Sequence, residues 1–156
     1  MEIRRARPGE AAVLSEIALS SKAYWGYDSR FIEACREALT LSEKSISEDF
    51  IYVLEASSGI IGFFSLTADP DKSELDFLFI KPEHIGLGYG KLLWNRILET
   101  AREAGISEFT IDADPNAEAF YLKMGAIRIG EVDSTIFSNR KLPLLKVTLD
   151  QENRKN

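Results

Sequence analysis

The stretch "FIKPEHIGLGYGKLLW", residues Phe79–Trp94, places glycine at positions 86, 88 and 90, between a strand-like run and an amphipathic helix. Glycine weakens both kinds of element, because it loses more backbone entropy on folding than any other residue. A glycine-rich loop that opens a helix, however, presents unpaired N–H groups at the positive end of the helix dipole and lets an anion approach closely. The stretch therefore predicts a strand–loop–helix unit that binds a phosphate through its backbone.

Two other phosphate motifs do not fit this spacing. A P-loop needs glycine five positions before Gly90 and Ser or Thr after the lysine, where this chain has Ile85 and Leu92. A dinucleotide fingerprint needs G-x-G-x-x-G near the start of a βαβ unit, whereas this chain has G-x-G-x-G late in the sequence. A glycine-rich connection needed only for tight packing stays open as an alternative.

The composition is typical of a soluble globular protein. Of 156 residues, 45% are hydrophobic and 28% charged, so we expect a single domain over residues 1–150 and a disordered tail over residues 151–156. No stretch approaches the ~20 apolar residues of a membrane span, and the N-terminus does not resemble a secretory signal. We therefore expect a cytoplasmic protein that does not engage a membrane.

Charge and cysteine content exclude several functions. One cysteine and one histidine leave no disulfide framework and no zinc constellation, so we expect no metal site. The formal net charge of −6 argues against a nucleic-acid binder and favours cationic small molecules.

Hydrophobic periodicity predicts the element order β-α-α-β-β-β-α-β-α-β-β, which is an α/β (α+β) sandwich around a mixed sheet. Helices are expected from Pro8, after Asp28, after the glycines and from Asp114 as a cap. Strands are expected over residues 2–6, 50–56, 60–67, 74–80, 108–114, 126–132 and 142–149.

Alternation along the strand 74–80 sorts its side chains onto two faces. One face is expected to carry Glu74, Asp76, Leu78 and Ile80, and the other Leu75, Phe77 and Phe79.

Two segments carry a resemblance to a known family. The stretch "LFIKPEHIGLGYGKLL" closely resembles the acetyl-CoA-binding motif of the GCN5-related N-acetyltransferases (GNAT), with Gly88 and Gly90 at its two small positions and Ile85 where the family has Gln or Arg. The segment "DADPNAEAFYLKMGAIRIGE" is similar to the family's late segment, in which an asparagine precedes an aromatic–tyrosine pair. The likeness covers about residues 2 to 149, and "HIG" with "AYWGYDSRFIEACREAL" is similar to an uncharacterised bacterial branch. It implies a mostly antiparallel central sheet of about seven strands flanked by about four helices.

The resemblance also implies how the cosubstrate acetyl-CoA is held. Loop N–H groups would bind the pyrophosphate, and the pantetheine arm would lie along the strand that ends at Ile80. The cofactor-binding residues expected on this basis are Leu78, Phe79, Ile80, Gly86, Leu87, Gly88, Tyr89, Gly90, Lys91, Asn116 and Tyr121.

Acetyl transfer needs a base for the amine and an acid for the departing thiolate. Tyr121 matches the family's general acid, although its spacing also suits a simple core position. Glu74 and Asp76, on one strand face, are candidate bases, and Asp112 is a weaker one. A solvated strand edge is the alternative for both, and the sequence does not choose between Glu74 and Asp76.

The remaining chemistry-bearing residues receive lesser roles. Cys35 falls on an apolar helix face, where a free cysteine behaves as a buried hydrophobe rather than a nucleophile. His84 is expected to face solvent, with a phosphate contact or a base role as alternatives. Tyr24, Trp25 and Tyr27 would either line the acceptor pocket or pack between two helices.

The expected function is an N-acetyltransferase that acts by direct attack in a ternary complex. The acceptor is expected to be a primary amine of a small molecule, or less readily of a peptide or protein. The alternative is an acyl-CoA-binding sensor without transfer activity. The loop 134–143 would border the pocket or contact a second subunit, and a strand edge near residues 142–149 suggests a homodimer.

Overall fold

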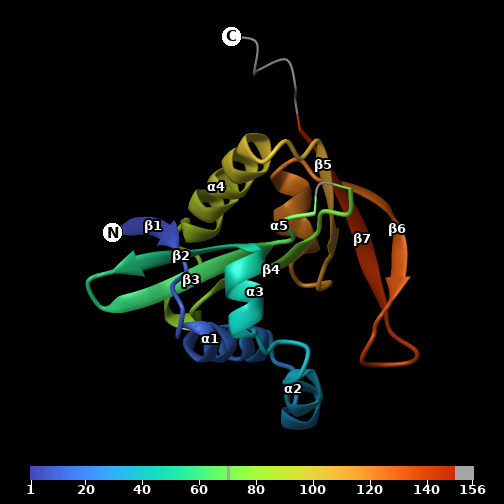
Figure 1. Ribbon diagram of the computed structural model, residues 1–156. Coiled ribbons are helices and arrows are strands. Elements are labelled where there is room, and N and C mark those ends of the chain that lie inside the picture. Colours follow the sequence, from blue (N-terminus) through green and yellow to red (C-terminus); the bar gives the residue numbers. More distant parts are fainter. Residues whose placement is uncertain (70, 150–156) are drawn as a thin grey trace.

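The computed structural model describes residues 1–69 and 71–149 (Figure 1). The expected tail, residues 151–156, lies outside the described residues. The elements follow the order β1 (Glu2–Arg5), α1 (Ala11–Ala23), α2 (Ser29–Cys35), α3 (Glu43–Glu48), β2 (Phe50–Ala56), β3 (Gly59–Leu66), β4 (Leu75–Ile80), the 3-10 helix η1 (Pro82–His84), α4 (Tyr89–Glu103), β5 (Glu108–Asp112), α5 (Glu118–Lys123), β6 (Ile127–Asp133) and β7 (Lys141–Thr148).

The strands form two sheets, ordered β1-β2-β3-β4 and β5-β7-β6, in which neighbouring strands pair antiparallel. An isolated parallel bridge between Glu74 and Thr110 joins them, and there the Thr110 N–H donates to the Ser73 carbonyl at 3.1 Å. No further backbone pairing between β4 and β5 is found over residues 1–69 and 71–149. The expected α+β, mostly antiparallel fold is confirmed, and the sheet opens between β4 and β5.

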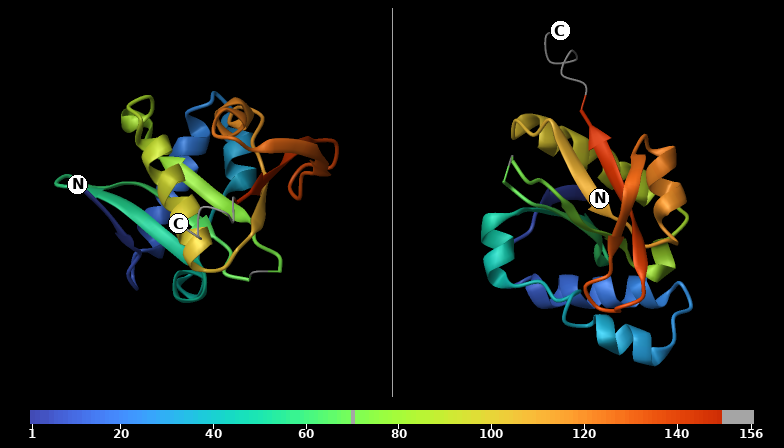
Figure 2. Two further views of the ribbon diagram at one scale, coloured as in Figure 1. Left: turned by 90° about the horizontal axis from the view of Figure 1, so that it is seen from above. Right: turned by 90° about the vertical axis from the view of Figure 1, so that its right-hand side faces the viewer.

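The helices α4 and α1 cover opposite faces of the larger sheet (Figures 1 and 2), and an apolar core lies beneath each of them. The helix α4 buries Leu93, Trp94 and Ile97 against one face, in a core that also contains Tyr121 of α5. The other core packs α1 against β2 and β3, and its members include Leu14, Ile17, Ile51, Val53 and Phe63. The open seam between β4 and β5 is therefore flanked by α4 and α5 on one side and by α1 on the other.

Helix boundaries differ from the sequence prediction in three places. The helix α1 begins at Ala11 rather than at Pro8, because Gly9 adopts a left-handed conformation with φ of 92° that ends the preceding turn. The helix α5 begins at Glu118, since Asp114 closes a turn by accepting the Asn116 N–H at 2.8 Å. The helix α3 was not predicted, although Ser42 caps it by accepting the Ser45 N–H at 3.1 Å.

The strand β4 contains a β-bulge that changes its faces. Leu66 pairs with Leu75 and Ser65 with Phe77, so Asp76 is an extra residue on the β4 side. Leu75 then lies in the α4 core with Leu78, whereas Phe77 packs toward the α1 core. The expected grouping of Leu75 with Phe77 and Phe79 is wrong for this reason, whereas Leu78 and Ile80 share one face and Phe77 and Phe79 the other, as expected.

The expected free strand edge near residues 142–149 is also wrong. β7 pairs with β5 along one side and β6 along the other, which makes it the central strand of its sheet. The unpaired outer strand of that sheet is β6, whose Ile127 and Ile129 are exposed. A homodimer stays a prediction.

The longest helix, α4, has 15 residues. Among the described residues, no helix has both the length and the apolar character required to cross a membrane. The cytoplasmic location expected from the sequence stays a prediction.

Candidate functional site

The glycine loop between η1 and α4 owes its shape to backbone conformation. Gly86 and Gly88 have φ of 86° and 89°, in the left-handed region that side chains rarely adopt. A Cβ added to either would meet nothing within 4 Å, so packing does not explain these glycines. Gly88 caps α4 without any side-chain hydrogen bond to the first turn.

This loop leaves its backbone donors available. Leu92 is the first residue whose N–H bonds into the helix, to the Gly88 carbonyl at 3.3 Å. Within the part of the chain that the structure describes, the N–H groups from Gly86 to Lys91 have no acceptor. Gly86, Leu87, Gly88 and Lys91 are exposed. The loop thus combines a helix N-terminus with open backbone donors, the arrangement that binds phosphate.

Gly90 has a different role from the other two loop glycines. Its φ is ordinary, and a Cβ there would lie 3.3 Å from the Phe120 ring of α5. The packing alternative considered for the glycines therefore applies to Gly90.

The outer edge of β4 offers backbone groups to the open seam. The Lys81 N–H donates to the Ile61 carbonyl at 2.8 Å. Hydrogen-bonded pairs alternate along an antiparallel ladder, so the backbone of Phe79 is directed to β3. The backbone groups of Leu78 and Ile80 are directed away from β3, toward the seam.

Ser21 of α1 uses one of these edge groups, because its buried hydroxyl donates to the Ile80 carbonyl. This contact ties α1 to the end of β4. It leaves the Leu78 groups and the Ile80 N–H for a chain that enters the seam as an added strand would.

Tyr121 lies on α5 at the edge of the α4 core, with 6% of its surface exposed. Its ring contacts those of Trp94 and Phe120, with centroids 5.8 and 5.5 Å away. No residue in the described ranges accepts a hydrogen bond from its hydroxyl. Burial, followed by the negative charge of Asp114, raises the pKa of Tyr121, so the phenol stays protonated.

Asp76 and Glu74 lie near the bridge between the two sheets. Asp76 accepts a hydrogen bond from the Thr67 hydroxyl at 2.7 Å. Loss of solvation raises the pKa of Asp76 to about 6, and the charges of Glu74, Asp49 and Asp112 act in the same direction. The Thr67 hydrogen bond opposes this shift. The pKa of Asp76 therefore lies close to neutral pH, in the range that suits a general base.

Asp114 lies two residues after the end of β5 and contacts Lys22, Tyr27, Asn116 and Arg140. Lys22 of α1 forms a hydrogen-bonded ion pair with it, and the Tyr27 hydroxyl donates to its two oxygens at 3.0 and 2.9 Å. The Asn116 amide donates to Tyr27 at 2.9 Å, as does Arg140 at 3.0 Å. Burial works to raise the pKa of Asp114, but the hydrogen bond and charge of Lys22 outweigh it and the pKa is lowered.

We refer to Lys22, Tyr27, Asp114, Asn116 and Arg140 as the Asp114 cluster. Sequence reasoning singled out Tyr27 and Asn116, gave Asp114 only as a helix cap, and missed Lys22 and Arg140. The hydrogen bond of Lys22 to Asp114 spans 92 positions and that of Arg140 to Tyr27 spans 113, so no local pattern indicates them. The predicted cofactor residue Asn116 has its amide N–H groups engaged by Tyr27 and Asp114.

The loop between β6 and β7 is held against this cluster by ring stacking. Phe31 of α2 stacks on Tyr27 at 4.0 Å and on Phe137 at 4.7 Å. The loop closes on itself, since the Ser134 N–H donates to the Arg140 carbonyl at 2.8 Å. The loop 134–143 thus borders the same region as Tyr27, as one of its two predicted roles requires.

The other residues considered from the sequence lie as follows. Cys35 is buried, and burial raises the pKa of its thiol, which agrees with its exclusion as a nucleophile. Tyr24 and Trp25 are exposed and contact each other edge-on at 5.2 Å. His84 is half-buried with its ring 6.1 Å from that of Tyr89, rather than fully facing solvent.

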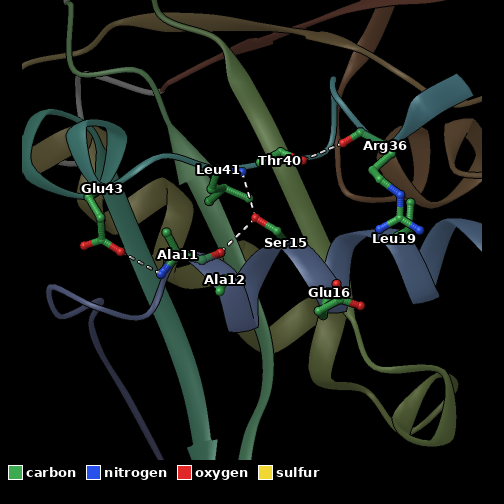
Figure 3. Close-up of a pocket in the computed structure, with 9 residues that line it drawn as sticks. All are labelled: Ala11, Ala12, Ser15, Glu16, Leu19, Arg36, Thr40, Leu41 and Glu43. Atoms are coloured by element: carbon green, nitrogen blue, oxygen red, sulfur yellow. Dashed lines mark hydrogen bonds between the residues drawn. The ribbon is translucent and has the colours of Figure 1, made fainter. Parts of the chain in front are cut away.

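A hollow of about 440 Å³ lies between α1 and the segment that leads to α3 (Figure 3). Its polar groups already serve the fold. Ser15 donates to the Ala11 carbonyl and accepts from the Leu41 N–H, both at 2.8 Å, and Glu43 accepts from the Ala11 N–H at 3.2 Å. This hollow contributes nothing to the site at the seam.

Comparisons with known proteins identify the family of the chain. The acetyltransferase (GNAT) domain family matches residues 15–135. The chain is 32% identical over 91 residues to the uncharacterized N-acetyltransferase ycf52 of Pyropia yezoensis, which covers 58% of this chain and 52% of that protein. The chain therefore belongs to the GNAT acetyltransferase family, as the resemblance in its sequence implied. It spans about half the length of the curated ycf52 relatives that it matches.

Two solved structures show the same fold. A GCN5-related N-acetyltransferase of Rhodopseudomonas palustris, described as "Aminotransferase, Class-II", superposes with a TM-score of 0.80 at 24% identity over 95% of both chains. The PaiA N-acetyltransferase of Thermoplasma acidophilum, in complex with coenzyme A, gives 0.77 at 23% identity over 94% of this chain and 98% of that chain.

Proposed function

We propose that this protein transfers acetyl from acetyl-CoA to a primary amine by direct attack within a ternary complex. The observation that carries the proposal is the run of free N–H groups from Gly86 to Lys91, beside a β4 edge that β5 leaves unpaired. Membership of the GNAT family supports it, and so does the coenzyme A bound to the structurally similar Thermoplasma protein.

The residues present fit this cosubstrate. The N–H groups of Gly86, Leu87, Gly88, Tyr89, Gly90 and Lys91 would hold the pyrophosphate, with the Lys91 ammonium adding charge. The pantetheine amides would pair with the free backbone groups of Leu78 and Ile80. The amide oxygen of Asn116 remains for a cofactor contact.

The proton transfers follow from the two pKa shifts. An ammonium must lose a proton before its nitrogen can attack the thioester carbonyl, and Asp76 accepts that proton directly or through water. We favour Asp76 over Glu74, because the Thr67 hydroxyl orients its carboxylate and its pKa lies near neutral pH. Tyr121 then donates its phenolic proton to the leaving thiolate. Its raised pKa keeps that proton available throughout the neutral range.

The proposed acceptor is a primary amine of a small molecule, with a peptide or protein amine as the less favoured class. The carboxylates of Glu74, Asp76 and Asp112 are together suited to an ammonium group. They lie by the seam where the thioester would be presented.

The test is calorimetric titration with acetyl-CoA of three proteins: the wild type, Gly88→Glu and Gly59→Glu. Gly88→Glu places a negative charge in the phosphate loop. Gly59→Glu is the matched control, because Gly59 also has a positive φ and open space around it but is the first residue of β3, far from the phosphate loop in sequence. Micromolar binding by the wild type and the control, and none by Gly88→Glu, supports the proposal.

No binding by the wild type would overturn the acetyl-CoA assignment. Where binding is found, release of coenzyme A with a panel of amines separates the enzyme from a sensor. Acetylated product indicates transfer, whereas binding without turnover of any amine favours the sensor.

A further inference from the structure

Arg140 is the surplus charge of the Asp114 cluster. The cluster contains two cations and one carboxylate, and Lys22 holds that carboxylate through a direct hydrogen bond. The nearest Arg140 nitrogen is 3.8 Å from Asp114, beyond hydrogen-bond reach. Arg140 instead donates to the Tyr27 hydroxyl, which carries no charge.

The guanidinium of Arg140 is oriented by its surroundings. Its central carbon lies 4.9 Å from the centroid of the Phe31 ring and 5.5 Å from that of Tyr27. One terminal nitrogen, Nη2, bonds to Tyr27, whereas Nε and Nη1 have no acceptor among residues 1–69 and 71–149. A guanidinium fixed over an aromatic ring presents its free edge as a fork that matches a carboxylate.

Asp112 and Asp114 connect this free edge to the surroundings of the proposed base. Asp112 and Asp114 are two residues apart on an extended segment, so their side chains share one face with Cα atoms about 7 Å apart. The extended pairing continues past β5, because the Ala113 N–H donates to the Pro143 carbonyl at 3.0 Å. Asp114 contacts Arg140, and the charge of Asp112 acts on Asp76.

We propose that Arg140 binds a carboxylate on the acceptor, and that the acceptor is an amine whose ammonium and carboxylate are separated by a few carbon atoms. The ammonium would meet Asp76, and the carboxylate would meet the Nε and Nη1 edge of Arg140. The inference rests on the proposed function, since it names the substrate class of that same site.

The test compares matched ligands that differ in the carboxylate alone. ω-Amino acids of increasing length, from β-alanine upward, are titrated beside n-alkylamines of the same carbon count, with coenzyme A present so that no turnover occurs. Wild type is expected to bind the best ω-amino acid about 10- to 100-fold more tightly than its amine, as a charge-assisted contact would give. Acetyl-CoA turnover is then measured with the same pairs.

Three variants test whether Arg140 causes the preference for ω-amino acids over alkylamines. Arg140→Met should abolish it, and Arg140→Lys should retain a small part, because lysine keeps the charge but loses the planar fork. Arg36→Met is the matched control: Arg36 directly follows α2, is exposed, and pairs with Glu33 at 3.2 Å. It should bind the ω-amino acid as the wild type does.

The inference is overturned if the ω-amino acids bind no better than the amines, if none of them binds, or if Arg140→Met keeps the preference. Failure of the proposed function has a different signature, which is loss of acetyl-CoA binding or of acetyl transfer to any amine. If n-alkylamines bind better than ω-amino acids and are acetylated efficiently, the role of Arg140 is refuted, but the proposed acetyltransferase function still holds.

Discussion

The ring of Phe120 lies 3.3 Å from the point where a Cβ on Gly90 would stand. Gly90 belongs to the first turn of α4, next to the proposed phosphate loop, and Phe120 precedes the proposed acid Tyr121 on α5. The two helices that would hold the pyrophosphate and protonate the thiolate therefore pack closely at a position where a side chain would have to displace the Phe120 ring. We expect cosubstrate binding and the placement of Tyr121 to be coupled through this contact.

Gly90→Ala should disturb both functions at once. The added methyl group displaces the Phe120 ring by a few tenths of an ångström, which we expect to lower the free energy of unfolding by about 1 kcal/mol. Acetyl-CoA affinity and kcat should both fall, measured by calorimetry and by coenzyme A release. Gly130→Ala in β6, with nothing within 4 Å, is the control and should leave all three quantities near wild type. Equal behaviour of the two variants would contradict the coupling.

The pKa of Asp76, raised to about 6, predicts the pH dependence of acetyl transfer. A base acts only when deprotonated, so kcat/KM should rise with pH and level off above about pH 6. Asp76→Asn should remove this rise together with most of the activity, while acetyl-CoA still binds. A profile that keeps its rise near pH 6 in the variant would assign the base to another group, with Glu74→Gln as the next test.

The substitution Asp76→Asn should also stabilise the fold at neutral pH. The pKa of Asp76 is about 6 when folded against 3.8 as the reference, so the folded state favours the protonated form. The stability linked to this proton is fully present below pH 3.8 and is lost as the pH rises to about 6. Asp76→Asn should match wild type near pH 3.5 and exceed it by about 1 kcal/mol at pH 8, after allowance for solvent screening. Urea unfolding at both pH values measures this, and Asp71→Asn, in the exposed loop before β4, is the control.

Local patterns in the sequence were sufficient to predict the fold class and the glycine-rich loop that opens α4. The place of this loop before α4 and the buried stripe of α4 depend on neighbouring residues alone, and both were predicted from spacing. The bulge at Asp76 was not, because it depends on the register between β3 and β4. One extra residue there transfers Leu75 to the opposite core, which strict alternation does not allow.

The Asp114 cluster was beyond local patterns for a related reason. Asp114 was predicted to cap α5, since an Asp before Pro is a common helix start. In the structure its carboxylate accepts the Asn116 N–H and closes a turn, which places the start of α5 at Glu118. Lys22 and Tyr27 bond to the same carboxylate from 92 and 87 positions away, so no local pattern indicates them.

Tyr121→Phe tests the proposed general acid. Loss of the phenolic proton donor should lower kcat by about 100-fold or more. Since no described residue bonds to the hydroxyl, the free energy of unfolding should change little, and acetyl-CoA affinity should stay at its wild-type value. Stopped turnover with intact binding and an unchanged melting temperature is the expected combination. A kcat close to wild type would return Tyr121 to a packing role.

Tyr27→Phe tests whether the Asp114 cluster holds the site together. The variant keeps the ring that stacks on Phe31 but removes the hydroxyl that donates to Asp114 and accepts from Asn116 and Arg140. Arg140 and Asn116 would each lose an acceptor and Asp114 one of its donors, which should lower the free energy of unfolding by about 1–3 kcal/mol.

Tyr27→Phe should change the kinetic constants that depend on the amine but not the affinity for acetyl-CoA, which distinguishes the Asp114 cluster from the phosphate loop. Release of Arg140 and of the segment before α5 should raise KM for the amine and lower kcat, while acetyl-CoA affinity stays within about twofold of wild type, since Gly86–Lys91 is untouched. Tyr24→Phe is the matched control, because Tyr24 is exposed and no described residue bonds to its hydroxyl. Equal stability and equal KM in the two variants would show that the Tyr27 hydroxyl does not organise the acceptor side, and would leave ring stacking as its contribution.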